Sequence, residues 1–123
     1  LVSSVVGKLP ASTNAFDAFR SAFPAGTLSG APKVRAMQLI ETFEPVKRGV
    51  YGGCVGYFGF DGNADLAIAI RTLVATGDTM TFQAGAGIVY DSVPALEYKE
   101  TLQKAGAVRR AIELAAAGLP VLG

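Results

Sequence analysis

Two kinds of residue that can bind charge lie near each other late in the chain. The segment Gly85-Ala86-Gly87 has almost no side chains, and Glu97 and Glu100 stand near the start of the helix predicted after it. Glycine lets a backbone approach a ligand closely and turn consecutive N–H groups toward an anion. Carboxylates three residues apart project from neighbouring helix positions, and such a pair can hold Mg²⁺. Together they predict a site where a divalent metal bridges an anionic substrate, although a tight turn and the helix dipole are ordinary explanations for each feature alone.

Arg71 interrupts the apolar run from Leu66 to Val74, which predicts a strand. Strand alternation places Arg71 on one face with Ala67 and Ala69, and these small neighbours leave room for a long side chain. An unpaired guanidinium inside such a strand costs several kcal/mol, so it needs a carboxylate or a phosphate, and its planar fork suits bidentate pairing. The partner is either an anionic ligand or an acidic side chain of the same protein.

Three further positions give weaker signals. Thr27 lies in a polar loop that leads into a helix N-terminus, which could seat an anion or could simply cap the helix. Lys104 lies one turn beyond Glu100, so a surface ion pair within one helix is its ordinary explanation. Cys54 is interpreted as a packing residue, because the chain has no histidine that could activate it.

These residues must be positioned by strands and helices that glycine and proline delimit. Predicted strands are residues 2–6, 50–60, 66–74 and 79–84, and predicted helices are residues 16–23, 32–43 and 94–117, with a small-residue loop at 25–30. Turn residues at 61–63 and 76–78 separate the strands, and the second turn predicts an antiparallel hairpin. Gly118 and Pro120 are expected to end the last helix. The predicted fold class is α+β.

Bulk properties exclude several classes of protein. The chain has 123 residues, of which half are hydrophobic, and a mean hydropathy of +0.38. Apolar runs stop short of the ~20 residues of a membrane span, so the apolar excess is expected to be surface that further protein covers. Acids and bases are interspersed at a net charge of +1, unlike the basic footprint of a nucleic-acid binder. The single cysteine fits a reducing, cytoplasmic location.

Five long motifs follow one another along the chain. They run from Phe23 to Lys33, Glu44 to Tyr57, Ile68 to Thr72, Gln83 to Val89 and Asp91 to Glu100. In this order they resemble the chorismate-utilising enzymes, and within that family anthranilate synthase component I. The resemblance covers nearly the whole chain, and several motifs in register are more specific than any one of them. It implies antiparallel strands with packed helices, as part of the layered α/β sandwich of chorismate-binding enzymes.

The resemblance also implies how the substrate would be held. Arg71 and Tyr51 would bind the carboxylate of the enolpyruvyl side chain of chorismate. The backbone amides of Gly85, Ala86 and Gly87 would help them to do so.

Further roles follow from the same resemblance. Thr27 would be a catalytic residue that lines the pocket near the ring, and Lys104 would face the substrate. Glu97 and Glu100 would hold Mg²⁺, directly or through water, and the metal would meet the ring carboxylate.

The implied reaction is amination of chorismate with loss of water, followed by elimination of pyruvate to leave anthranilate for tryptophan biosynthesis. Ammonia would come from a glutamine amidotransferase subunit. Family members are considerably longer and carry upstream metal-binding acids and a histidine, whereas this chain has no histidine and opens within strand-like residues. Residues 1–123 are therefore expected to be the C-terminal portion of a single chorismate-binding catalytic domain, and to be inactive alone.

Other assignments remain open at this point. Aminodeoxychorismate synthase component I has similar motifs, and isochorismate and salicylate synthases share the arginine, the glycine segment and the two glutamates. A non-catalytic anion-binding fragment is the alternative outside the enzymes, because the histidine and the further acids are missing. Neither a nucleic acid nor a membrane is expected as a partner.

Overall fold

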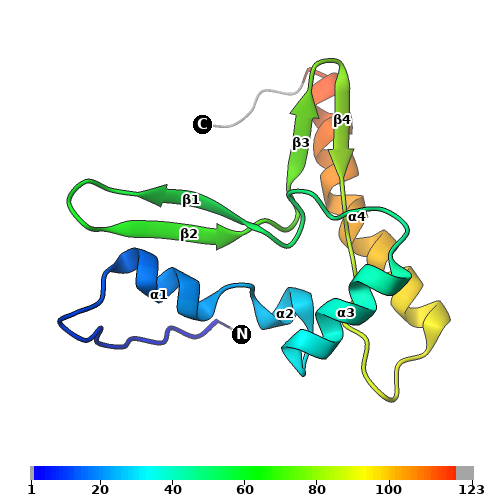
Figure 1. Cartoon of the computed structure of the whole chain (residues 1–123). Helices are drawn as coiled ribbons and strands as arrows, with labels where there is room; N and C mark the ends of the chain where they lie inside the picture. Colours follow the sequence, from blue (N-terminus) through cyan, green and yellow to red (C-terminus); the bar gives the residue numbers. More distant parts are fainter. Residues whose placement is uncertain (1, 119–123) are drawn as a thin grey trace.

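The computed structural model describes residues 2–118 (Figure 1). Three helices come first, then four strands, then a long helix: α1 (Ala15–Ala22), α2 (Gly26–Ser29), α3 (Lys33–Phe43), β1 (Cys54–Phe58), β2 (Ala64–Ile68), β3 (Leu73–Thr76), β4 (Thr79–Phe82) and α4 (Pro94–Ala116). The strands form two antiparallel hairpins, β1–β2 and β3–β4. The α+β prediction with antiparallel strands is confirmed.

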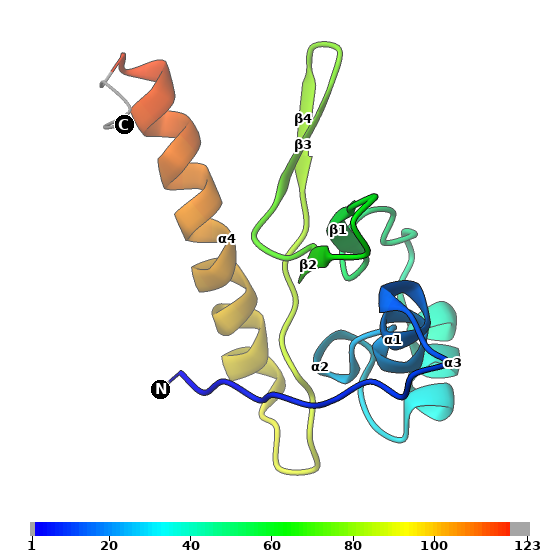
Figure 2. The same ribbon diagram turned by 90° about the vertical axis from the view of Figure 1, so that its left-hand side faces the viewer.

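Each hairpin is accompanied by a helix. The α1 helix lies under β1–β2, and α4 runs alongside β3–β4 (Figures 1 and 2). Asn14 and Asp17 form a reciprocal capping box at the start of α1, which stabilises the first turn of that helix. The ring of Phe58 in β1 lies 5.6 Å from that of Phe16 and 6.0 Å from that of Phe19. Aromatic packing therefore joins α1 to the first hairpin.

The predicted strand 66–74 is wrong as one continuous strand. Ala69 still pairs with the chain beside β1, since its N–H donates to the Gly53 carbonyl at 2.9 Å and its carbonyl accepts from the Gly52 N–H at 3.0 Å. The chain then leaves the first hairpin at Ile70 and Arg71 and begins β3 at Leu73. Arg71 has a φ of 51°, an uncommon value for a residue with a Cβ. Arg71 is thus at the junction of two hairpins and not inside a strand.

Other predicted boundaries also shift. Residues 2–6 form no strand in the described part of the chain, and Val2, Val5 and Val6 are exposed. A strand needs a neighbour to pair with, and residues 2–118 provide none for this segment. The predicted strand 50–60 shortens to β1 because its glycine-rich start forms turns. The predicted loop 25–30 contains the short helix α2. The last helix, α4, ends one residue earlier than predicted, shortly before Gly118, which has a φ of 70°. Pro120 is outside the described residues.

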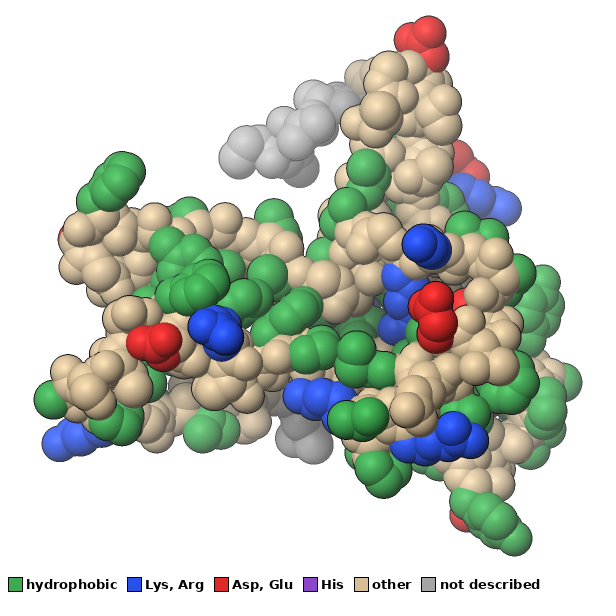
Figure 3. Space-filling model, viewed as in Figure 1, with side chains coloured by type: hydrophobic (Ala, Val, Ile, Leu, Met, Phe, Trp, Pro, Cys, Tyr) green, Lys and Arg blue, Asp and Glu red, His purple; other side chains and the backbone are tan. Residues whose placement is uncertain are grey.

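Apolar side chains lie largely on the surface. The chain exposes 10385 Å², whereas a compact monomer of its mass would expose about 6,200 Å². Ala69 is the buried hydrophobic residue of the described part, while Phe60 and Tyr90 are fully exposed. Hydrophobic side chains gather over α1 and the first hairpin (Figure 3). No helix within residues 2–118 has both the length and the apolarity needed to cross a membrane.

Candidate functional site

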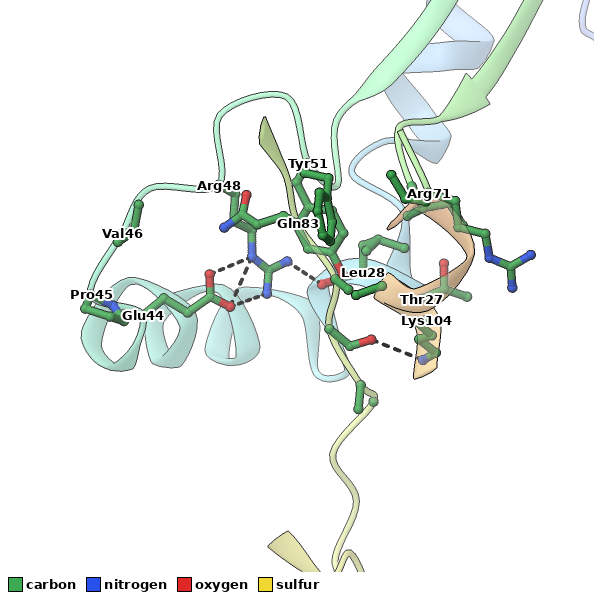
Figure 4. Close-up of a pocket in the computed structure, with 18 residues that line it drawn as sticks. Thr27, Leu28, Glu44, Pro45, Val46, Arg48, Tyr51, Arg71, Gln83 and Lys104 are labelled. Atoms are coloured by element: carbon green, nitrogen blue, oxygen red, sulfur yellow. Dashed lines mark hydrogen bonds and ion pairs between the residues drawn. The ribbon is translucent and has the colours of Figure 1, made fainter. Parts of the chain in front are cut away.

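The largest set of predicted site residues meets at one cavity of about 650 Å³ (Figure 4). Its walls come from α2, the segment between α3 and β1, the junction at Arg71, the segment after β4, and α4. The volume lies in the range of small-molecule sites. Seven of the nine predicted site residues line it, namely Thr27, Tyr51, Arg71, Gly85, Ala86, Gly87 and Lys104.

The glycine segment presents free amides at this cavity. The N–H groups of Gly85, Ala86 and Gly87 donate no hydrogen bond to any residue within 2–118. Gly85 lets Tyr51 approach closely, because a Cβ there would lie 2.8 Å from the tyrosine hydroxyl and one of the two would have to shift. Consecutive unpaired amides beside a tyrosine hydroxyl form a set of donors that an anion can accept.

Lys104 connects α4 to the glycine segment. Its Nζ donates to the carbonyl of Gly85 at 3.1 Å and forms an ion pair with Glu100 at 2.5 Å. The side chain is 38% exposed, so the ammonium can also face the cavity. The predicted surface pair with Glu100 is therefore present, and the lysine additionally contacts the segment that carries the free amides.

Arg71 lies at the cavity wall but is not oriented as the sequence suggests. Figure 4 shows its guanidinium pointing away from the other labelled side chains. The residue is exposed and has no hydrogen bond or ion pair within residues 2–118. The argument from strand alternation is wrong, because the strand is broken here. Arg71 is nevertheless an unpaired cation at the wall of the cavity.

Thr27 and the two acidic residues differ in their relation to the cavity. Thr27 is in α2 and lines it, although the residue belongs to a helix and not to a loop. Neither Glu97 nor Glu100 lines it; Glu97 borders a neighbouring cavity of about 340 Å³ that shares Ala86 with the first.

A metal centre at Glu97 and Glu100 would depend on further donors from water and substrate. Glu97 and Glu100 have the oxygen ligands that Mg²⁺ prefers, and one or two carboxylates can suffice when water and substrate supply the rest. Glu100, however, is paired with Lys104. Residues 2–118 contain no cluster of three His, Cys, Asp or Glu side chains able to hold a metal ion. The two carboxylates are the type of ligand that Mg²⁺ prefers, and their number suffices only when water and substrate supply the remaining ligands.

Sequence reasoning missed a pair of residues at the cavity wall, Glu44 and Arg48. The Arg48 Nε donates to both carboxylate oxygens of Glu44, at 3.1 and 2.9 Å, and Nη2 donates to Oε1 at 2.5 Å. Nη1 donates to the Leu28 carbonyl at 2.8 Å, and the guanidinium carbon lies 5.5 Å from the ring centroid of Tyr51. The Glu44 carboxylate raises the pKa of Arg48 through this hydrogen bonding. Opposite charges four residues apart were the available signal.

Comparison with known proteins identifies the family of this chain. Residues 1–110 match the family of chorismate binding enzymes. The anthranilate synthase component 1 of Pseudomonas putida is 59% identical over 115 residues, which are 94% of this chain and 23% of that protein. The component 1 of Bacillus subtilis is 53% identical over 94% of this chain and 22% of its own length. This chain therefore spans less than a quarter of these relatives.

A solved structure gives the same result. The crystal structure of anthranilate synthase component I from Streptococcus pneumoniae TIGR4 superposes with a TM-score of 0.79 at 51% identity, covering 83% of this chain and 23% of that one. The resemblance that the motifs indicate is confirmed. Since the match extends over residues 1–110 of 123, this chain belongs to the family of chorismate binding enzymes.

Proposed function

We propose that this chain supplies the substrate-binding C-terminal portion of the catalytic domain of an anthranilate synthase component I. The enzyme would convert chorismate and ammonia or glutamine to anthranilate and pyruvate. The observation that carries the proposal is the cavity in which Tyr51, the free amides of residues 85–87 and Lys104 meet. Relatives with that name are 53–59% identical over most of this chain.

The charges of the cavity support an anionic substrate with two carboxylates. Its ionised lining residues are Glu44, Arg48, Arg71 and Lys104. Because Glu44 and Arg48 neutralise each other, Arg71 and Lys104 remain as the cations at the cavity wall that a ligand could pair with, although Lys104 also pairs with Glu100. Two cations and a row of amides would fix both ends of a small dicarboxylate, which accelerates a reaction by orientation.

Arg71 would bind the enolpyruvyl carboxylate together with Tyr51 and the amides of the glycine segment. This role requires the side chain to turn from the orientation seen in Figure 4 toward that segment. The side chain is exposed, and exposed rotamers interconvert within about nanoseconds. Thr27, on the α2 wall, would lie near the ring.

Glu97 and Glu100 would contribute carboxylates to a Mg²⁺ site at the start of α4. Mg²⁺ supplies charge stabilisation at an oxygen that gains negative charge during a reaction. The further ligands would come from water, from the substrate and from parts of a longer polypeptide. Such a polypeptide would also receive ammonia from a glutamine amidotransferase subunit, as the word component in the relatives' names suggests.

Pyruvate release tests the proposed reaction. In a full-length enzyme that carries this segment, chorismate, ammonium and Mg²⁺ are expected to give anthranilate and pyruvate in equal amounts, followed by fluorescence and by a coupled reduction of pyruvate. Amination without pyruvate release would assign aminodeoxychorismate synthase instead. Binding of chorismate without any turnover would leave a non-catalytic anion-binding protein.

Removing one acidic ligand tests the metal site. Glu97→Gln in the same full-length enzyme is expected to raise the Mg²⁺ concentration for half-maximal activity by at least about 10-fold, because one charged oxygen ligand is lost. Asp78→Asn, in the turn between β3 and β4, is the matched control and should leave that concentration unchanged. An unchanged Mg²⁺ requirement in Glu97→Gln would remove Glu97 from the metal site.

A further inference from the structure

The guanidinium of Arg48 contacts three parts of the chain that form the cavity wall. It holds Glu44 at the end of α3, the Leu28 carbonyl in α2 and the ring of Tyr51, as Figure 4 shows. The Arg48 side chain is 25% exposed and that of Glu44 is 35% exposed, so the pair is partly shielded from water. Each nitrogen of the guanidinium donates to a protein oxygen. Arg48 is therefore already neutralised and is a poor candidate for binding the substrate directly.

The contact with Leu28 stabilises the short helix α2. This helix has four residues and no side-chain N-cap, and so short a helix is unstable without tertiary contacts. The Leu28 carbonyl belongs to the last turn, where carbonyls lack partners within the helix. A cation at that end also interacts favourably with the helix dipole. Arg48 thus holds the helix that carries Thr27 from a position 20 residues along the chain.

The contact with Tyr51 sets the opposite wall. A guanidinium within about 6 Å of a ring centroid is attracted by the face of the ring. The hydroxyl of the same tyrosine faces Gly85, so the ring spans the distance between Arg48 and the glycine segment. Gly52 lies over this arrangement, since a Cβ there would be 3.7 Å from both Arg48 Nη1 and the Leu28 Cβ. Movement of Arg48 would displace both walls together.

We propose that Arg48, oriented by Glu44, is a positioning residue that fixes the α2 wall and Tyr51 relative to the glycine segment for substrate binding. The kinetic part of this inference rests on the proposed function. Lysine cannot replace this arginine, because an ammonium lacks the planar fork that reaches a carboxylate and a carbonyl at the same time and also lies flat on a ring.

The test compares two similar Glu–Arg pairs in a full-length enzyme that carries this segment. Arg48→Met is expected to raise the KM for chorismate and to lower kcat/KM by roughly 10- to 100-fold, since displacement of a positioning group by about 1 Å has effects of this size. Arg109→Met is the matched control: Arg109 pairs with Glu113 at the same i,i+4 spacing but is 77% exposed and does not line the cavity. It should leave KM unchanged.

Two conservative variants separate positioning from folding. A smaller folded fraction lowers the apparent kcat but leaves KM unchanged, so the KM identifies positioning. Arg48→Lys and Glu44→Gln should both give a folded enzyme, and both should raise the KM for chorismate. Compared with Arg48→Met, Arg48→Lys should recover thermal stability but not the KM of the unsubstituted enzyme. A KM equal to that of the unsubstituted enzyme in both variants would overturn the proposal.

A direct binding measurement separates this inference from the proposed function. Calorimetric titration with chorismate gives the Kd without turnover. Arg48→Lys is expected to raise this Kd by about the same factor as it raises the KM. If the unsubstituted enzyme binds chorismate but releases no pyruvate, the proposed reaction fails while the Kd still decides the role of Arg48. If it does not bind chorismate at all, both inferences fail.

Discussion

Arg71→Lys is expected to lower kcat/KM for chorismate by roughly 10- to 100-fold in a full-length enzyme that carries this segment, mainly by raising KM. Lysine keeps the positive charge but loses the planar fork that can hold a carboxylate with two parallel hydrogen bonds. Arg71→Gln, which also removes the charge, should have a larger effect. Steady-state release of anthranilate over a range of chorismate concentrations measures both parameters.

The choice of lysine keeps the backbone unchanged in this experiment. Arg71 has a φ of 51°, and lysine has the same cost in this conformation as arginine, whereas glycine would relieve it. Arg110→Lys on the exposed surface of α4, where Arg110 faces Glu113 at 3.5 Å, is the control and should not change kcat/KM. If Arg71→Lys behaves like this control, the arginine has no role in substrate binding.

Local signals explain which elements the sequence predicts well. The capping box at Asn14, the proline that opens α4 and the turn residues between the paired strands act within a few residues of the structure they determine. These signals suffice for α1, α3, α4 and the β3–β4 hairpin, whereas the sequence predicts a loop where α2 forms. They do not determine how the two hairpins are joined.

The junction at Arg71 could not be predicted from the residues around it. Ile70 and Arg71 have no preference for a turn, and apolar residues lie on both sides of Arg71. The break arises because Ala69 pairs with Gly52 and Gly53 and the chain then crosses to the second hairpin. This is a long-range interaction, and long-range pairing overrides local strand propensity.

The same distinction applies to the candidate site. Arg48 and Glu44 look like an ordinary pair of surface charges, and only the fold reveals that Arg48 also reaches Leu28 and Tyr51. Chemical type and resemblance indicated the glycine segment, Tyr51 and Lys104, but their meeting in one cavity depends on contacts between distant parts of the chain. The sequence could therefore suggest which residues bind a ligand. It could not identify the residues that hold those ligand-binding residues in place.

The first hairpin offers a test of the fold beneath the site. Gly56 in β1 pairs with Leu66 in β2, and a Cβ on Gly56 would overlap the Asp65 carbonyl oxygen and lie 2.7 Å from the Leu66 Cα. Both are backbone atoms, which cannot rotate away as a side chain would. Gly56→Ala is therefore expected to separate the two strands and to lower the free energy of unfolding by at least about 3 kcal/mol.

Urea unfolding of the full-length enzyme measures this loss, and Gly106→Ala provides a control with the same chemical change. Gly106 lies within α4, and a Cβ there would meet no atom of residues 2–118 within 4 Å apart from its chain neighbours and the backbone of its own helical turns, so alanine should stabilise the helix by up to about 1 kcal/mol. The loss of β1–β2 pairing should also reach the cavity, because Gly53 and Gly52 beside β1 hold Ala69 and adjoin Tyr51. Gly56→Ala should thus raise the KM for chorismate in the fraction that remains folded, while an unchanged unfolding curve would mean that β1 and β2 do not pair in this register.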